Sequence, residues 1–140
     1  MTASFLGENL RKDLFHIGLL TQRKKALINP NSTKKVVFTK TLDRSEWDNT
    51  VLGKGDLVDE ITKLKKQDGT DIIAYGGATF VSALIKQRLI DEFHLFINPT
   101  AIGNGMTIFK ELDSKQNLTL VKSISFNCGI VVLNYEPKRD

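Results

Sequence analysis

The chain has 140 residues, of which 41% are hydrophobic and 26% charged, and its net charge is +4 at pH 7. These values fit one soluble globular domain, residues 1–140, and fall short of the concentrated basic surface of a nucleic-acid-binding protein. A single cysteine excludes an internal disulfide, no apolar run reaches membrane-spanning length, and residues 1–10 lack the pattern of a signal peptide. We therefore expect a cytoplasmic protein with neither nucleic acid nor membrane as a partner.

The first predicted element is a helix near the N-terminus. Its apolar residues share one face at helical spacing: Leu10, Leu14, Ile17 and Leu20. A second helical piece is expected over residues 22–28, before the turn formers at 29–32. Basic residues at 23–25 and 34–35 are typical of a solvated helix face, with anion binding as the alternative.

The first predicted buried strand covers residues 36–38, Val-Val-Phe. Thr39, Lys40 and Thr41 follow it. Ligands of open α/β sheets collect outside the carboxyl ends of strands, and hydroxyl and ammonium groups are suitable ligands for phosphate. These three residues are therefore candidates for an anion site, and a simple polar loop is the alternative.

A short strand is expected at residues 50–52, after a connection in which Trp47 is predicted to anchor against the core. Asp56 then caps an amphipathic helix whose apolar stripe contains Leu57, Ile61 and Leu64. Acidic residues in its first turn and lysines at its end agree with the helix dipole. We interpret this helix as structural.

The central stretch, residues 71–88, predicts a strand, a Gly-Gly turn and a helix. An apolar run at 72–75 is typical of a buried strand, and Val81, Leu84 and Ile85 recur at helical spacing. Gly76 and Gly77 would let a ligand approach the backbone at the helix start, where unpaired N–H groups suit an anion. The alternative is a tight turn that needs glycine for a positive φ.

The rest of the chain predicts three strands, at residues 93–97, 118–126 and 130–135, and the last two form an antiparallel hairpin. The usual catalytic signatures are absent. His16, expected in a helix, and His94, expected in a strand, form no metal-ligand pattern, and Cys128 has no activating neighbour.

Several motifs occur together in a characteristic order. They are Lys-Val-Val-Phe-Thr-Lys-Thr-Leu at 35–42, Trp-Asp-Asn at 47–49, Ile-Ala-Tyr-Gly-Gly-Ala-Thr-Phe at 73–80, Leu-Ile-Asp-Glu at 89–92, and Pro99 with Gly-Asn-Gly at 103–105. As an ordered set over residues 34–137, they resemble the dihydrofolate reductase-like superfamily. The specific resemblance is to the reductase domain of the bifunctional riboflavin-biosynthesis protein and its stand-alone relatives.

The resemblance implies an α/β fold: a mostly parallel sheet flanked by helices, ending in an antiparallel hairpin. It also implies a homodimeric, NADPH-dependent reductase that transfers hydride to a pterin-like or ribosylaminopyrimidine substrate. By the match, the cofactor's phosphates fall on Gly76, Gly77, Ala78, Thr79 and Phe80. Thr39, Lys40 and Thr41 fall on its adenosine side.

The chain departs from the family before residue 34, where the strand with its Asp-Gly loop, the following helix and the Gly-Arg motif are not found. We expect a strand–helix–strand opening of about 40 residues to be missing, which leaves the fold incomplete at its N-terminus. No carboxylate can be assigned as proton donor. Two alternatives stay open: a non-enzymatic relative that keeps a dimer interface or a weak nucleotide site, and a small basic nucleic-acid-binding domain.

Overall fold

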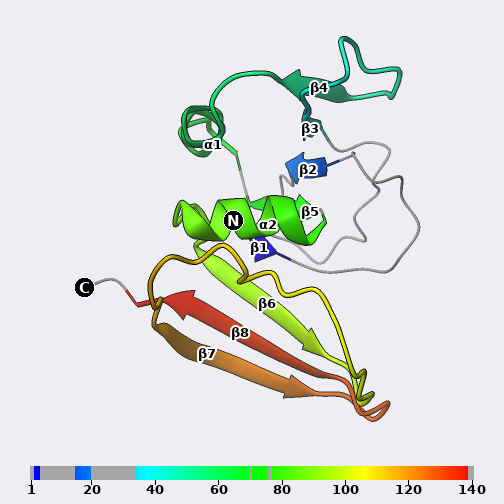
Figure 1. Ribbon diagram of the computed structural model, residues 1–140, viewed down its shortest axis with the longest axis vertical. Coiled ribbons are helices and arrows are strands. Elements are labelled where there is room, and N and C mark those ends of the chain that lie inside the picture. The colour runs from blue at the N-terminus through cyan, green and yellow to red at the C-terminus, as the bar shows by residue number, and fades with distance from the viewer. Residues whose placement is uncertain (1, 4–14, 20–33, 70, 76, 139–140) are drawn as a thin grey trace.

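The computed structural model describes residues 2–3, 15–19, 34–69, 71–75 and 77–138. Within these ranges it forms one sheet with two helices packed against it (Figure 1). In chain order the elements are β1 (Thr2–Ala3), β2 (Phe15–Leu19), β3 (Lys35–Phe38), β4 (Thr50–Gly53), α1 (Leu57–Lys65), β5 (Ile72–Tyr75), α2 (Ala78–Lys86), β6 (Glu92–Ile97), β7 (Leu118–Ser125) and β8 (Val131–Pro137).

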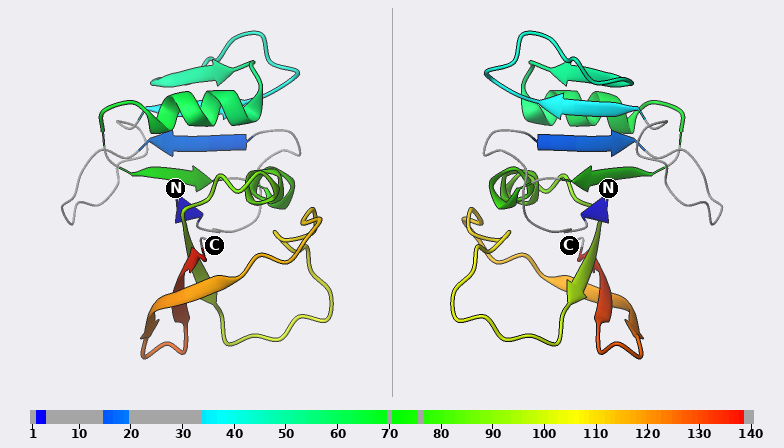
Figure 2. Two further views of the ribbon diagram at one scale, coloured as in Figure 1. Left: turned by 90° about the vertical axis from the view of Figure 1, so that its left-hand side faces the viewer. Right: turned by 90° about the vertical axis from the view of Figure 1, so that its right-hand side faces the viewer.

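The strands lie in the order β4-β3-β2-β5-β1-β6-β8-β7. β4 is parallel to β3, and β1 is parallel to both β5 and β6. β8 runs antiparallel to β6 and β7, which gives the expected terminal hairpin. β2 runs antiparallel to both of its neighbours, as Figure 2 shows for β2 and β5, so the sheet is mixed. The predicted α/β class with a closing hairpin is confirmed.

The prediction of a helix near the N-terminus is wrong for residues 15–19, the part of it that the structure describes. Residues 15–19 form β2, which pairs with β3 and β5 and places His16 in a strand. Phe15, Ile17 and Leu19 alternate with a period of two, as in a strand. A short apolar run does not distinguish this period from the helical period of 3.6 residues. Gly18 disfavours a helix interior, and two neighbouring strands satisfy the backbone of β2 instead. Leu10, Leu14, Leu20 and the helical piece at 22–28 lie outside the described residues.

The core lies between the sheet and the two helices. Val36 and Phe38 of β3 share a buried cluster with Ile72 and Ala74 of β5 and with Phe93 of β6. The helices contribute apolar residues to the same cluster: Ile61, Leu64, Phe80, Val81, Leu84 and Ile85. The strand residues alternate along the chain, so both helices pack on one face of the sheet.

α1 follows its sequence pattern closely. The Asp56 carboxylate accepts hydrogen bonds from the backbone N–H groups of Val58 and Asp59, at 2.9 and 3.2 Å. Ile61 and Leu64 are buried, as the apolar stripe predicts. The prediction for Trp47 is wrong, since its side chain is 44% exposed in the connection before β4. The backbone there is held locally, because the Ser45 hydroxyl accepts a hydrogen bond of 3.1 Å from the Trp47 N–H, and this contact does not require the indole to be buried.

Candidate functional site

The two segments predicted to hold an anion lie at the same edge of the sheet. β2 pairs with both flanking strands, so His16 lies opposite Val37 on one side and Tyr75 on the other. β3 and β5 therefore run in the same direction and end at the same level. The ring of Phe38 stacks on that of Phe80, with centroids 5.7 Å apart, and this contact joins the end of β3 to the first turn of α2.

The loop after β3 closes on its own threonines. The Thr39 hydroxyl oxygen accepts from the backbone N–H groups of Thr41 and Leu42, each at 3.2 Å, and lies 3.3 Å from the Thr41 hydroxyl. Thr39 therefore shapes the turn. Lys40 and Thr41 are exposed at its outside, where an ammonium and a hydroxyl face solvent.

The start of α2 is built differently from the start of α1. Gly77 is the N-cap, without a side-chain hydrogen bond, and the first turn of α2 contains no acidic residue. α1 has the Asp56 cap with Asp59 and Glu60 in its first turn. The first N–H groups of α2 thus have neither a capping side chain nor a carboxylate of that turn beside them, which favours an external anion.

Gly77 has φ −65° and ψ 160°, an extended conformation that any residue adopts. The alternative that this glycine is needed for a positive φ is therefore wrong. Gly76 lies outside the described residues. What glycine does provide at position 77 is the absence of a side chain at the helix start, where a ligand could reach the backbone.

The three helix residues among the candidates differ in what they present. Ala78 and Phe80 are 5% and 6% exposed, so their side chains belong to the core and only their backbone can face a ligand. Thr79 is exposed, and its hydroxyl accepts a hydrogen bond of 3.0 Å from the ammonium of Lys110. Lys110 therefore adds a full positive charge to the start of α2.

The sequence analysis did not identify Lys110, which lies 31 residues beyond its Thr79 partner. Its segment is fixed along α2 by further contacts. The buried Ser82 hydroxyl accepts from the Glu111 N–H at 3.0 Å, and Lys86 pairs with Asp113 at 3.0 Å. Polar residues recur on α2 at positions 79, 82 and 86, which lie on one face of the helix. This spacing is the one sequence signal that a polar chain segment packs along α2.

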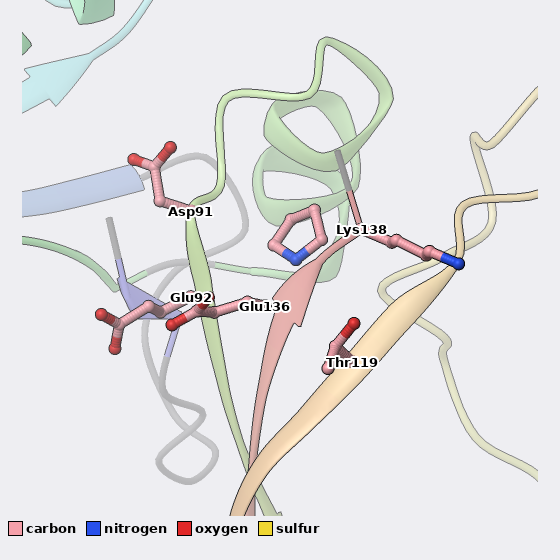
Figure 3. A pocket seen from close by; sticks show the side chains of 6 residues that line it. Asp91, Glu92, Thr119, Glu136 and Lys138 are labelled. Atoms are coloured by element: carbon pink, nitrogen blue, oxygen red, sulfur yellow. The ribbon is translucent and has the colours of Figure 1, made fainter. Parts of the chain in front are cut away.

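A hollow of about 550 Å³ lies at the opposite edge of the sheet, near the start of β6 (Figure 3). Its lining comes from the start of β6, the end of β8 and the adjoining part of β7: Asp91, Glu92, Thr119, Glu136, Pro137 and Lys138. Because β6 runs parallel to β1 and β1 to β5, this hollow is remote from the start of α2. It contains none of the predicted site residues.

Asp91, beside this hollow, connects β6 to the end of α1 through an ion pair with Lys65. Partial burial acts to raise the pKa of the Asp91 carboxyl. The hydrogen bond from Lys65 and its positive charge act in the opposite direction, and the pKa lies below its usual value. Among the described residues, no group of three or more His, Cys, Asp or Glu side chains is placed to hold a metal ion.

Comparison with known proteins gives the chain's family. The profile of the RibD C-terminal domain matches residues 11–132. The chain belongs to this family. The resemblance stated from the motifs is thereby confirmed, and so is membership of a group of reductase-like proteins connected with riboflavin biosynthesis.

Two proteins of Bacillus subtilis are similar to the chain. Uncharacterized protein YyaP is 38% identical over 106 residues, which cover 75% of this chain and 55% of YyaP. Uncharacterized protein YwjB is 36% identical over 68 residues, 49% of this chain and 39% of YwjB. The chain therefore spans about half the length, or less, of these curated relatives.

Crystal structures of related proteins have the same fold. A putative riboflavin biosynthesis protein of a Shewanella species superposes with a TM-score of 0.65 at 27% identity, over 74% of this chain and 60% of that one. Acinetobacter baumannii RibD gives 0.54 at 23% identity, over 64% and 27% of the two chains. A pyrimidine reductase-like protein of Corynebacterium diphtheriae gives 0.52 at 20%, over 65% and 39%. In the described ranges, neither helix is long and apolar enough to cross a membrane.

Proposed function

We propose that the chain is an NADPH-dependent reductase of the riboflavin-biosynthesis type that acts in the cytoplasm. Its substrate would be a ribosylaminopyrimidine or a pterin-like compound. The observation that carries the proposal is the meeting of two predicted phosphate-binding segments at one sheet edge, in a chain of the RibD C-terminal domain family.

The residues present fit a dinucleotide. The backbone N–H groups at the start of α2, together with the Lys110 ammonium, would hold the pyrophosphate, because the dipole and the cation both favour negative charge there. Lys40 and Thr41 would lie on the adenosine side. The buried side chains of Ala78 and Phe80 would hold the helix start against the sheet. When bound, the nicotinamide supplies the hydride, and the protein positions it and excludes water.

A second candidate function is a nucleotide-binding relative without turnover. The specific observation in its favour is the chemistry of the predicted site residues, which are Thr, Lys, Gly, Ala and Phe. None of these side chains is a carboxylate or an imidazole that could deliver a proton near neutral pH. The two functions share the cofactor site and differ in whether a substrate is reduced.

A thermal-shift titration with NADPH, with NADH alongside, tests the cofactor site. A ligand that binds only the folded state adds about 2.7 kcal/mol of stability at one hundred times its dissociation constant. We expect a saturable shift that is reduced in Lys110→Ala and retained in Lys115→Ala, the matched control from the same exposed region.

The result separates the candidate functions. A cofactor-dependent shift followed by NADPH oxidation with a ribosylaminopyrimidine supports the reductase. A shift without oxidation of NADPH by any substrate of the two classes supports the binding relative. A well-folded sample that shows no shift with either nucleotide contradicts both.

A further inference from the structure

The connection from β6 to β7 has two parts that pack differently. Residues 107–113 lie along α2, where the Glu111 N–H donates to the buried Ser82 hydroxyl. Residues 98–106 come before them and leave the end of β6 as a wide arc (Figure 2). Ile102 and Met106, the large apolar residues of this arc, are 73% and 81% exposed. The arc therefore contributes little to the core and is open to solvent.

Asn104 and Gly105 form an Asn-Gly pair inside the arc. Both residues are exposed and lie outside helices and strands, and neither makes a hydrogen bond to the described residues. A Cβ built at Gly103 would meet nothing within 4 Å, and one at Gly105 only the end of the Ile102 side chain, at 3.4 Å. With a glycine on each side, the backbone at Asn104 can change its dihedral angles without a clash.

We propose that Asn104 is a site of spontaneous covalent modification, at which its side-chain amide becomes a carboxylate through a cyclic imide. The backbone nitrogen of Gly105 attacks Cγ of Asn104 and forms a new C–N bond. The bond from Cγ to the side-chain nitrogen breaks, and this nitrogen leaves as ammonia with the proton of the Gly105 N–H. The product is a five-membered succinimide ring. The step needs no oxidant or reductant, and the proposal does not depend on cofactor binding.

Water then opens the ring in one of two ways. It adds a hydroxyl to one ring carbonyl carbon and a proton to the ring nitrogen, and the bond between these two atoms breaks. Opening at the side-chain carbonyl gives aspartate at position 104. Opening at the main-chain carbonyl gives isoaspartate, in which one extra carbon lies in the backbone. Either product replaces a neutral amide by a carboxylate, so the net charge of +4 falls by one.

Other asparagines in the described ranges lack this combination of features. Asn98 is followed by Pro99, which has no N–H and cannot react in this way. Asn134 lies inside β8, where pairing with two strands fixes its backbone. Asn127 is exposed, but the side chain of Cys128 crowds the next nitrogen, and backbone hydrogen bonds of 2.9 and 2.8 Å close its hairpin turn. Asn127 is therefore the internal comparison for Asn104.

The fold should survive the modification. The segment that follows the arc is held to α2 by the Ser82–Glu111 hydrogen bond and the Lys86–Asp113 ion pair, each at 3.0 Å. An extra backbone carbon at position 104 lengthens an exposed arc and leaves these contacts in place. We therefore expect the modified protein to unfold at the same urea concentration as the unmodified protein.

Peptide mapping by mass spectrometry tests the site after the folded protein is incubated at mildly alkaline pH. The peptide with Asn104 should gain about 1 Da and separate into two products, aspartate and isoaspartate, while Asn127 stays unchanged. Hydroxylamine, which cleaves a succinimide, should split the chain into residues 1–104 and 105–140. Gly105→Ala is the matched variant, since the added Cβ has room and φ at position 105 is not positive. It should slow conversion roughly tenfold or more, because the Cβ crowds the attacking nitrogen and restricts its dihedral angles.

The same measurement on the urea-unfolded chain tests the contribution of the fold. Because the arc is open, Asn104 should convert at nearly the same rate in the folded and the unfolded chain. Several results would overturn the proposal: no conversion at Asn104, equal rates in the wild type and Gly105→Ala, or strong protection of Asn104 by folding. A modified protein that unfolds at lower urea concentration than the unmodified one would contradict the independence of the arc from the core.

Discussion

Replacing Gly77 by aspartate should stabilise the protein and at the same time weaken its binding of an anionic ligand. Gly77 is the N-cap of α2 in an extended conformation, without a side-chain hydrogen bond. Aspartate can adopt this conformation and make the cap that Asp56 makes for α1. Serine at position 77 would provide the cap without the charge, so Gly77→Ser is the matched variant.

The two effects have opposite signs. A capping side chain in place of glycine is worth a few tenths of a kcal/mol, and a carboxylate at a helix start adds about 0.3–1 kcal/mol. Gly77→Asp should therefore unfold at higher urea concentration than the wild type. A ligand phosphate about 4 Å from the new carboxylate would be repelled by about 4 kcal/mol at an effective dielectric constant near 20. Because the side chain can turn away, we expect at least a tenfold loss of affinity.

The assay combines urea unfolding without ligand and a thermal-shift titration with NADPH on the wild type and both variants. We expect the stability order to be aspartate, then serine, then glycine, and the affinity of the aspartate variant to be the lowest. If the aspartate variant binds NADPH as tightly as the serine variant, the phosphates do not lie at the start of α2, and the reasoning fails.

Three further predictions concern the structural contacts. Ser82→Ala should cost about 1–3 kcal/mol in urea unfolding, because the Glu111 N–H loses its acceptor. Phe93→Ala should cost about 3–5 kcal/mol by the same measurement, since Phe93 is completely buried in the cluster. The pKa of Asp91 is lowered in the folded state, so its contribution to stability is present above the unfolded pKa near 3.9 and is lost as the pH falls through the folded value. Unfolding of Asp91→Asn, followed from pH 6 to pH 2, should lack that part of the acid dependence.

Each of these predictions has an outcome that contradicts it. A Ser82→Ala protein as stable as the wild type would show that another acceptor or water serves Glu111. A loss below 1 kcal/mol for Phe93→Ala would contradict its place in a close-packed core. Identical acid unfolding of wild type and Asp91→Asn would mean that the Lys65 pair does not distinguish the folded from the unfolded state.

Local patterns predicted most of the chain from residue 34 onward. The apolar run at 72–75, the glycine pair and the spacing of Val81, Leu84 and Ile85 gave β5 and α2, and Asp56 gave the start of α1. These signals work because side-chain periodicity and capping are properties of neighbours in the chain. The motif order added the family, which the RibD C-terminal domain match confirms.

Other features depend on contacts between distant residues. The spacing of Leu10, Leu14, Ile17 and Leu20 predicts a helix, but pairing with β3 and β5 on either side makes residues 15–19 a strand. Trp47 is large and apolar, yet its side chain is 44% exposed in the connection before β4. Neither the strand at residues 15–19 nor the exposure of Trp47 can be predicted from the residues next to it in the chain.

The candidate site divides in the same way. The sequence by itself determined that two segments after buried strands have the chemistry of an anion site, because residue type and position along a strand are local facts. Only the tertiary structure brought the ends of β3 and β5 to one level, placed Lys110 on Thr79, and left Gly77 without strain. Strand register and the packing of a distant loop arise from free energies summed over the whole fold, and a single stretch of sequence does not contain them.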